Sequence, residues 1–344
     1  MARDDLIGLQ EVARLAGVGA SAVANWRVRY PDFPPSVAEL RSGPVFDKDQ
    51  VERWVRRRRT TVGRTIATIN LKGGVGKSTT TVATALIMAG FFSKRVLVID
   101  LDPQTNATVM LIGEKRWGVL NDAGNTLERL FADALAPDGS DERFVLASAL
   151  QRNVGKVQEA RKVDLLPSSL DLIGLQDRLA TMPSGPFFAN VPTDILHRAT
   201  RGLVDEYDYV LIDCPPNLGL ITLNGLRIAD GYIIPTIPDI LSTYGIPQIE
   251  SRIAQFAQNV GIPIRPLGIA LTKVREQSTT HRNTARRLRS SSQIPVFDAQ
   301  IPESNSLAAA AEYQAIGTVR QKLGYGDTFN SYYALTEEIM KAAN

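Results

Sequence analysis

The chain carries the sequence TIATINLKGGVGKST at residues 65–79, where a strand-like apolar run leads into a glycine-rich loop. Glycines let the backbone N–H groups of such a loop fold around an anion. The helix expected to begin near Lys77 would direct its positive N-terminus at the same anion. Strand, glycine spacing, lysine and the Ser-Thr pair together predict a loop that binds nucleotide phosphates, rather than an incidental glycine-rich turn.

The two lysines of this loop have different expected tasks. Lys77 would place a positive charge on the terminal phosphates, and Ser78 would offer its hydroxyl to Mg²⁺. The common P-loop pattern requires a glycine six residues before its lysine, but that position is Leu71. An additional lysine, Lys72, precedes the double glycine instead. The expected nucleotide-binding residues of the loop are Gly73, Gly74, Val75, Gly76, Lys77, Ser78 and Thr79.

Two later apolar runs end in carboxylates. The sequence VLVIDLDPQ at residues 96–104 contains Asp100 and Asp102, and YVLIDCPP at 209–216 contains Asp213. Because ligands bind at the carboxyl ends of parallel strands, these side chains should face the phosphate loop. Asp213 stands where an acid would hold Mg²⁺, usually through water. For any one of these residues the alternative is a helix cap or a turn.

Apolar runs of strand length alternate with helix-length segments along most of the chain. This alternation predicts an α/β fold with a mostly parallel sheet covered by helices on both faces. We expect an irregular excursion at 111–140 and a loop at 183–192. The expected strands are 66–69, 96–99, 163–166, 209–212, 232–237 and 266–271, and the expected helices include 79–89, 170–181, 218–228 and 248–259.

Length, charge and composition bound the class of protein. A chain of 344 residues suggests two domains, and we place the boundary near residues 60–64, giving domains 1–62 and 63–344. Residues 1–63 hold eleven Arg/Lys against eight Asp/Glu, whereas the rest is balanced, so a basic module precedes a neutral body. One cysteine and two histidines exclude an internal disulfide and a Cys/His metal cluster. With no membrane-length apolar run and no signal-peptide pattern, we expect a cytoplasmic protein.

Residues 64–344 resemble the ParA/MinD family of ATPases with a deviant Walker A loop. Three segments look like the core motifs of that family: KGGVGKST at 72–79, VLVIDLDPQTNAT at 96–108 and YVLIDCPPNLG at 209–219. Further segments that resemble ParA proteins are LLPSSLDL at 165–172, TLNGLRIADGYIIPTIPD at 222–239, ALTKV at 270–274 and IPESNSLAAAAEY at 301–313.

The resemblance implies ATP and Mg²⁺ as cofactors and a homodimer that sandwiches two ATP molecules. Lys72 would then be the signature lysine, which reaches the nucleotide of the partner subunit. Lys77 would hold the terminal phosphates, Asp102 would orient the attacking water, and Asn217 departs from the serine that many members carry. If Lys72 arrives only from the partner, hydrolysis depends on dimerisation and is slow. The resemblance also places Ser78, Asp100 and Asp213 around Mg²⁺, and Thr272, Lys273 and Pro302 near the adenine.

The N-terminal segment 9–29 has the apolar spacing of two short helices joined at Gly17–Gly19, which is a helix-turn-helix pattern. The sequence GPVF at 43–46 suggests a small wing, and Asp47 is expected to cap the helix at 48–57. The whole looks like a MerR-like winged helix, with a helical adaptor for a protein partner as the alternative. The residues expected to face a DNA major groove are Ser21, Asn25, Arg27 and Arg29.

A second basic cluster follows the ALTKV segment, with only Glu276 opposing it in the sequence. In ParA-like dimers a basic surface in the C-terminal half binds DNA without reading its sequence, and contacts to phosphates supply affinity of this kind. The alternative is a solvated charged helix face. The residues of this cluster are Arg275, Arg282, Arg286, Arg287 and Arg289.

These features together favour a nucleoid-associated DNA-partition ATPase that is stimulated by a ParB-like centromere-binding protein. In that interpretation the N-terminal module reads an operator or a partition site. Two rivals stay open: an ATP-gated transcription regulator, and a positioning ATPase of MinD type that cycles on membrane. The acidic, short C-terminus at 332–341 does not resemble the basic amphipathic helix of MinD-like proteins, so no membrane partner is expected.

Overall fold

The computed structural model divides into two compact units, Met1–Val62 and Gly63–Asn344. In the N-terminal unit it describes residues 6–16, 23, 26–27, 33–40 and 43–59. In the C-terminal unit it describes residues 63–136, 143–155, 160–180, 191–304, 318–323 and 326–344.

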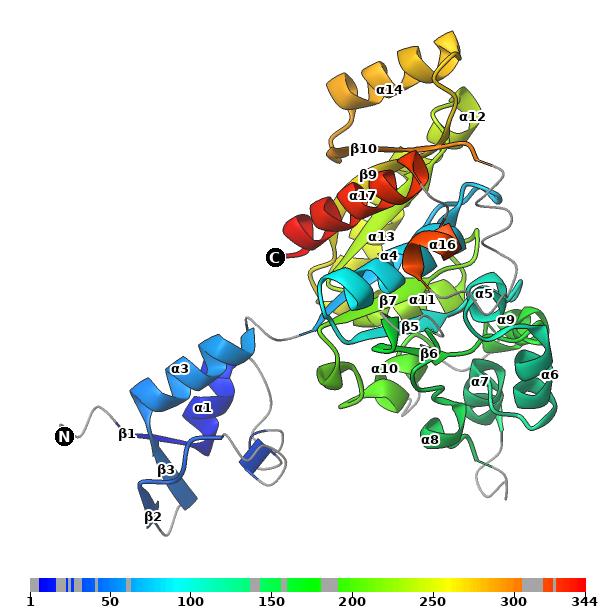
Figure 1. Cartoon of the computed structure of the whole chain (residues 1–344). Coiled ribbons are helices and arrows are strands. Elements are labelled where there is room, and N and C mark those ends of the chain that lie inside the picture. Colours follow the sequence, from blue (N-terminus) through cyan, green and yellow to red (C-terminus); the bar gives the residue numbers. More distant parts are fainter. Residues whose placement is uncertain are drawn as a thin grey trace. The chain divides into compact units, whose positions relative to one another are not determined.

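The C-terminal unit is built on a seven-stranded sheet in the order β10-β9-β8-β4-β7-β5-β6 (Figure 1). Every neighbouring pair in it is parallel, which confirms the predicted α/β fold. All six expected strands are present, and the seventh, β10, is an edge strand that the sequence analysis did not identify. The strands are β4 (Arg64–Thr68), β5 (Val96–Asp100), β6 (Val163–Leu166), β7 (Tyr209–Asp213), β8 (Gly231–Thr236), β9 (Arg265–Val274) and β10 (Val296–Pro302).

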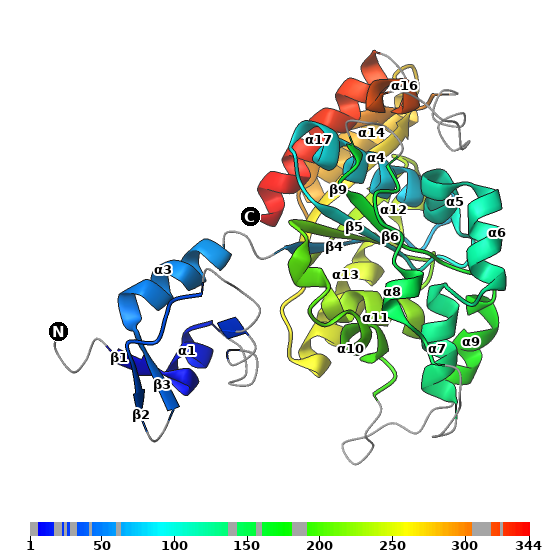
Figure 2. The same ribbon diagram turned by 60° about the horizontal axis from the view of Figure 1, so that its bottom comes forward.

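Helices cover both faces of this sheet, as Figures 1 and 2 show. Consecutive strand residues alternate between two apolar cores: Val96 and Val98 belong to one, Leu97 and Ile99 to the other. Both faces are therefore buried, as parallel sheets require. The first core includes residues of α4 (Lys77–Phe91), α5 (Asn106–Ile112), α16 (Val319–Leu323) and α17 (Asp327–Ala343). The second includes residues of α7 (Leu127–Leu135), α8 (Leu146–Ala149), α9 (Leu172–Ala180), α10 (Ile195–Thr200), α11 (Leu220–Ile228), α13 (Ile246–Val260) and α14 (Thr279–Ser291).

The expectation of an irregular excursion at 111–140 was wrong. After α5 the chain forms α6 (Glu114–Asp122) and then α7. Helix α7 buries Leu127, Leu130 and Phe131, an i, i+3, i+4 stripe. Helix α6 has no fully buried residue, so it lacks the periodic apolar face that reveals a helix in a sequence. The expected loop at 183–192 lies almost wholly outside the described residues.

The N-terminal unit contains a small antiparallel sheet in the order β1-β3-β2. The wing segment at 43–46 belongs to its central strand, and Asp47 accepts a hydrogen bond from the Gln50 backbone N–H at 2.8 Å, which confirms the expected cap. Trp54 is buried and packs against Trp26. The proposed turn at Gly17–Gly19 lies outside the described residues. The elements are β1 (Leu6–Gly8), α1 (Leu9–Ala16), β2 (Ala38–Leu40), β3 (Gly43–Asp47) and α3 (Lys48–Arg59).

Candidate functional site

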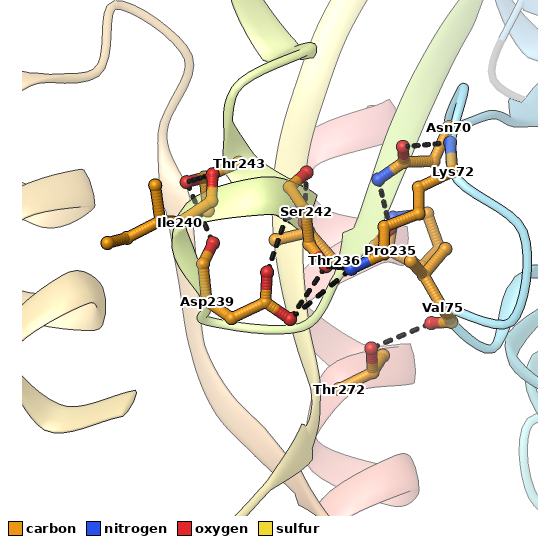
Figure 3. Close-up of polar contacts among 10 residues, drawn as sticks. All are labelled: Asn70, Lys72, Val75, Pro235, Thr236, Asp239, Ile240, Ser242, Thr243 and Thr272. Atoms are coloured by element: carbon orange, nitrogen blue, oxygen red, sulfur yellow. Dashed lines mark hydrogen bonds and ion pairs between the residues drawn. The ribbon is translucent and has the colours of Figure 1, made fainter. Parts of the chain in front are cut away.

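The glycine-rich loop connects the carboxyl end of β4 to the first residue of α4, Lys77. Gly74 and Gly76 have φ angles of 74° and 85°, in the left-handed region where a side chain is disfavoured. The hydroxyl of Thr272, on β9, donates a 2.7 Å hydrogen bond to the carbonyl of Val75 (Figure 3). The loop is thus held in its turn both by its own glycines and by a neighbouring strand.

A cavity of about 240 Å³ lies over this loop and the start of α4. Most of the expected phosphate-binding residues line it, together with Asp102 and Lys273, whereas Val75 is buried behind the loop. Thr272 and Pro302, expected near the adenine, are not among its lining residues within the described chain. Five others had no role predicted from the sequence, although two of them, Gln104 and Asn106, lie within four residues of Asp102. The lining residues are Gly73, Gly74, Gly76, Lys77, Ser78, Thr79, Asp102, Gln104, Asn106, Val109, Met110, Pro216 and Lys273.

Lys77 is a buried cation at the base of the cavity, with 6 % of its surface exposed. Its Nζ donates a hydrogen bond to the carbonyl of Lys72 at 3.2 Å. Burial lowers the pKa of Lys77, and the negative charges of Asp213 and Asp102 act in the opposite direction. A phosphate in the cavity would satisfy this ammonium with the anionic partner that it lacks at hydrogen-bond distance among the described residues.

Asp213 ends β7 with a fully buried carboxyl group. Its Oδ2 has no hydrogen-bond partner in the described part of the chain, and Oδ1 lies 3.5 Å from the Thr81 hydroxyl. Burial, and then the nearby charge of Asp100, raise the pKa of Asp213 well above its usual value. A hydrogen bond from the Ser78 hydroxyl opposes this shift. The free Oδ2 of Asp213 and the hydroxyl of Ser78 are a donor set that suits Mg²⁺.

Asp100, expected in the Mg²⁺ water shell, has both oxygens occupied by protein donors. Oδ2 accepts from the backbone N–H and the hydroxyl of Thr108 at 2.8 and 2.7 Å, and Oδ1 accepts from the Asp102 N–H at 3.1 Å. Burial raises the pKa of Asp100 to about 7. In this arrangement Asp100 organises the turn between β5 and α5.

Asp102 is the acid that reaches the cavity. Its Oδ1 accepts from the Gln104 N–H at 3.0 Å, and its carbonyl accepts from the Ser168 hydroxyl at 2.8 Å. Burial raises the pKa of Asp102, with Lys77 opposing that shift. In the described part of the chain, no three His, Cys, Asp or Glu side chains are placed to hold a metal ion by themselves.

Lys72 is not among the residues that line the phosphate cavity, and its side chain is directed at Ser242 and Asp239 (Figure 3). Its Nζ donates to the Ser242 hydroxyl at 2.8 Å and lies 3.5 Å from Asp239 Oδ2. Both partners belong to the segment that begins α12 (Ile240–Thr243). Lys72 instead lines a separate cavity of about 290 Å³ beside α12. Neither Asp239 nor Ser242 is among the site residues predicted from the sequence.

The arginines after β9 carry less unopposed charge than the sequence suggests. Arg275 pairs with Glu303, with a 3.0 Å contact from its Nη2 to Oε1, and Arg289 lies 3.5 Å from Asp298. The expectation that only Glu276 opposes this cluster was therefore wrong, because both acids come from β10 or just beyond it. Within α14, Arg282, Arg286, Arg287 and Arg289 are all exposed, and the helix contains no acid.

In the N-terminal unit, Arg27 forms a 2.9 Å ion pair with Glu39 and lies 5.7 Å from the centre of the Phe46 ring. Its guanidinium is thus held by its own unit. The other three residues expected to face a major groove, Ser21, Asn25 and Arg29, lie outside the described residues. Across the described ranges, no helix has the length and apolar character of a membrane span.

The chain is similar in sequence to proteins of a known family. Residues 63–265 match the family described as "AAA domain". The chain is 30% identical over 281 residues to the chromosome partitioning protein ParA of Myxococcus xanthus, covering 82% of this chain and 89% of that protein. It is also 30% identical to the chromosome-partitioning ATPase Soj of Thermus thermophilus, over 80% of this chain and 95% of that one.

A solved structure shares the fold of the C-terminal unit. It is described as cobyrinic acid a,c-diamide synthase from Mycobacterium smegmatis with bound ATP analogue and magnesium. The two chains are 25% identical and superpose with a TM-score of 0.61, over 80% of this chain and 93% of that one. A fold shared with a nucleotide-bound structure agrees with the cavity over the glycine-rich loop.

Proposed function

Because this chain belongs to the ParA/MinD family of P-loop ATPases, we propose that it works as a DNA-partition ATPase. Two subunits close on ATP, bind DNA without reading its sequence, and separate after slow hydrolysis that a ParB-like partner stimulates. The observation that carries this proposal is the division of labour between two loop lysines. Lys77 faces the phosphate cavity from within the subunit, whereas Lys72 is partly exposed and directed elsewhere.

The residues present fit ATP and Mg²⁺. The loop amides and Lys77 would hold the phosphates, and the hydroxyl of Ser78 and the free oxygen of Asp213 would hold the ion with its waters. Bound Mg²⁺ would neutralise charge that develops on the phosphates during transfer. Asp102, which reaches the cavity, would orient the attacking water. Asp100 would act on that reaction by fixing the turn that carries Asp102.

A second subunit has an apolar surface available beside Lys72. On α12, Ile240 and Leu241 are 61% and 78% exposed, and Tyr244 just after it is 75% exposed. Large apolar side chains exposed together mark interaction surfaces. Covering them with a partner subunit would bring that subunit next to Lys72, as an ATP sandwich requires.

The test of this dimer is light scattering with ATP, ADP and no nucleotide. We expect a dimer with ATP only, and we expect Lys72→Ala to weaken it or to leave a dimer that cannot hydrolyse ATP. Lys115→Ala, on the exposed surface of α6, is the matched control and should behave like the parent. A parent protein that stays monomeric with ATP, while still binding it, would refute the proposal.

Affinity for DNA would come chiefly from the exposed arginines of α14, since contacts with phosphates are electrostatic and sequence-independent. Arg286→Glu together with Arg287→Glu should remove ATP-dependent DNA binding and leave the ATP-dependent dimer intact. The N-terminal unit would add recognition of a specific operator or partition site. With both of these proposed activities, the protein would work in the cytoplasm, on the nucleoid.

Helix α17 gives no support to a MinD-type cycle on membrane. Helix α17 buries Phe329, Tyr332, Leu335 and Ile339 in the core, so its apolar face already serves the fold. Absence of ATP-dependent co-sedimentation with liposomes would agree with this. The N-terminal unit favours a second candidate, an ATP-gated transcription regulator. Altered transcription with unchanged inheritance of DNA in a deletion strain would support that candidate instead.

A further inference from the structure

We infer that Asp239 and Ser242 form an anchor that holds Lys72 within its own subunit and opposes its transfer to the nucleotide of a partner. The inference rests on the proposed function, because it concerns the same lysine. It adds two positioning residues and a source of regulation: a subunit must release Lys72 before the two-subunit form can close.

Hydrogen bonds that do not involve Lys72 hold the two residues of the anchor in place (Figure 3). Asp239 caps α12: its Oδ1 accepts from the Ser242 N–H at 2.7 Å, and its Oδ2 accepts from the Ser242 hydroxyl at 2.9 Å. The Ser242 carbonyl in turn accepts from the hydroxyl of Thr236 at 3.0 Å, at the end of β8. The two oxygen atoms that contact Lys72 are therefore fixed by other hydrogen bonds.

The lysine end of the contact is fixed as well. The Lys72 N–H donates to Asn70 Oδ1 at 2.9 Å, and Asn70 Nδ2 donates to the Pro235 carbonyl at 2.8 Å. These bonds join the start of the phosphate loop to the end of β8, from which the anchor follows. The backbone and the side chain of Lys72 are therefore both tied to the segment that runs from Pro235 to Ser242.

The anchor and the phosphates of a nucleotide would compete for the positively charged ammonium group of Lys72. Burial alone would raise the pKa of Asp239, but hydrogen bonds from Ser242 and the charge of Lys72 outweigh it, and the pKa is lowered. If Lys72 leaves for a phosphate, Asp239 loses its cation, and the Ser242 hydroxyl, on a residue only 1% exposed, loses a donor. Loss of these contacts must be offset by the gain at the phosphate.

Two variants remove the anchor and keep the helix. Asp239→Asn removes the charge but preserves the cap, since asparagine is an equally good N-cap residue. Ser242→Ala removes the 2.8 Å contact and keeps the backbone N–H that Asp239 caps. Either variant should lower the ATP concentration for half-maximal dimer by roughly threefold to tenfold, the range expected for one partly exposed ion pair or hydrogen bond. Asp122→Asn, on exposed α6, is the matched control and should leave this concentration unchanged.

A double-mutant cycle without nucleotide tests whether the anchor acts through Lys72. We expect Asp239→Asn to lower the Tm of the parent protein and to have little effect in a Lys72→Ala background. Equal losses in both backgrounds would show a role in α12 alone and would overturn the inference. If Asp239→Asn does not fold, Ser242→Ala serves in the same cycle.

The two failures are distinguishable. A parent that never dimerises with ATP contradicts the proposed function. A parent that dimerises, with anchor variants that need the same or more ATP, contradicts the anchor and leaves the proposed function standing.

Discussion

Asp213 and Asp100 are both fully buried at the ends of neighbouring strands, but their carboxyl groups differ in how many hydrogen bonds they accept. Asp100 accepts from three donors, whereas Oδ2 of Asp213 has no partner within the described residues. A buried carboxylate that is satisfied by the protein supports structure. One with a free oxygen is available to a ligand.

This difference predicts a separation of stability from activity. Asp100→Asn cannot accept at both oxygen positions, so we expect it to lower the free energy of unfolding by ~1–3 kcal/mol. Asp213→Asn removes a buried charge, so it should be neutral or stabilising while Mg²⁺-dependent hydrolysis is lost. Urea denaturation without nucleotide and a phosphate-release assay measure the two effects. Equal destabilisation by both variants would contradict this assignment.

Lys322, on α16, gives a pH dependence. It is 7% exposed, its Nζ donates to the Met110 carbonyl at 2.6 Å, and burial lowers its pKa from 10.5 to about 8. Between these two values the unfolded chain holds a proton that the folded chain has lost. This group therefore makes the free energy of unfolding rise with pH between about 8 and 10.5, by a total on the order of 3 kcal/mol.

Lys322→Met should remove that rise. The measurement is the free energy of unfolding in urea at pH 7.5 and 9.5, compared between parent and variant. The variant should gain stability relative to the parent at the lower pH, because it no longer buries a charge there. An unchanged difference between the two pH values would show that Lys322 keeps an ordinary pKa.

The packing of β9 against β10 depends on a missing side chain. A Cβ on Gly268 would lie 2.5 Å from the nearest ring carbon of Phe297, which is itself buried. We expect Gly268→Ala to lower the free energy of unfolding by ~1–3 kcal/mol through overpacking. Gly118→Ala is the matched control: a Cβ there meets nothing within 4 Å on helix α6, so it should stabilise by ~0.5–1 kcal/mol. Thermal denaturation of both variants reads out the opposite signs, and a loss of stability in Gly118→Ala would contradict the helical account.

At the scale of elements, the sequence predicts strands that are apolar on both faces, and it misses elements whose apolar pattern is weaker. Most of the six expected strands are rich in Val and Ile, and helix-length segments separate them. In contrast, β10 alternates buried Phe297 and Ile301 with exposed Asp298 and Gln300, as an edge strand does. Helix α6 was missed for the same reason, since no side chain of it is fully buried. Periodicity reveals an element only through the core that the element covers.

At the scale of the whole molecule, the phosphate loop could be predicted because its residues are contiguous in the sequence. The anchor could not be predicted, because its residues are far apart in the sequence. Lys72 and Asp239 are separated by 167 residues, and only the pairing of β4 with β8 brings their loops together. The acids that oppose the arginine cluster were missed in the same way, since Glu303 lies 28 residues after Arg275. Contacts that depend on strand order cannot be deduced from local pattern.

The two compact units predict two separable activities. Deleting residues 1–62 should abolish binding to an operator or partition site and leave ATP-dependent dimerisation and nonspecific DNA binding unchanged. Mobility-shift assays with a candidate site and with unrelated DNA measure both. Loss of both activities in a truncated protein that still unfolds cooperatively would show that the units do not divide the work.

Strand β9 and the residues after it carry three different tasks in succession. Thr272 grips the phosphate loop, Lys273 lines the cavity, and Arg275 starts the basic cluster. Only three residues of chain lead from Thr272 to Arg275, and the strand bends between them, because Lys273 has a φ of 49° in the left-handed region. The cavity that would hold the nucleotide therefore lies close in sequence to the basic cluster that would contact DNA. A ligand that displaced the phosphate loop would disturb a segment that ends at Arg275, so nucleotide occupancy and the proposed DNA-binding surface would be coupled through these few residues.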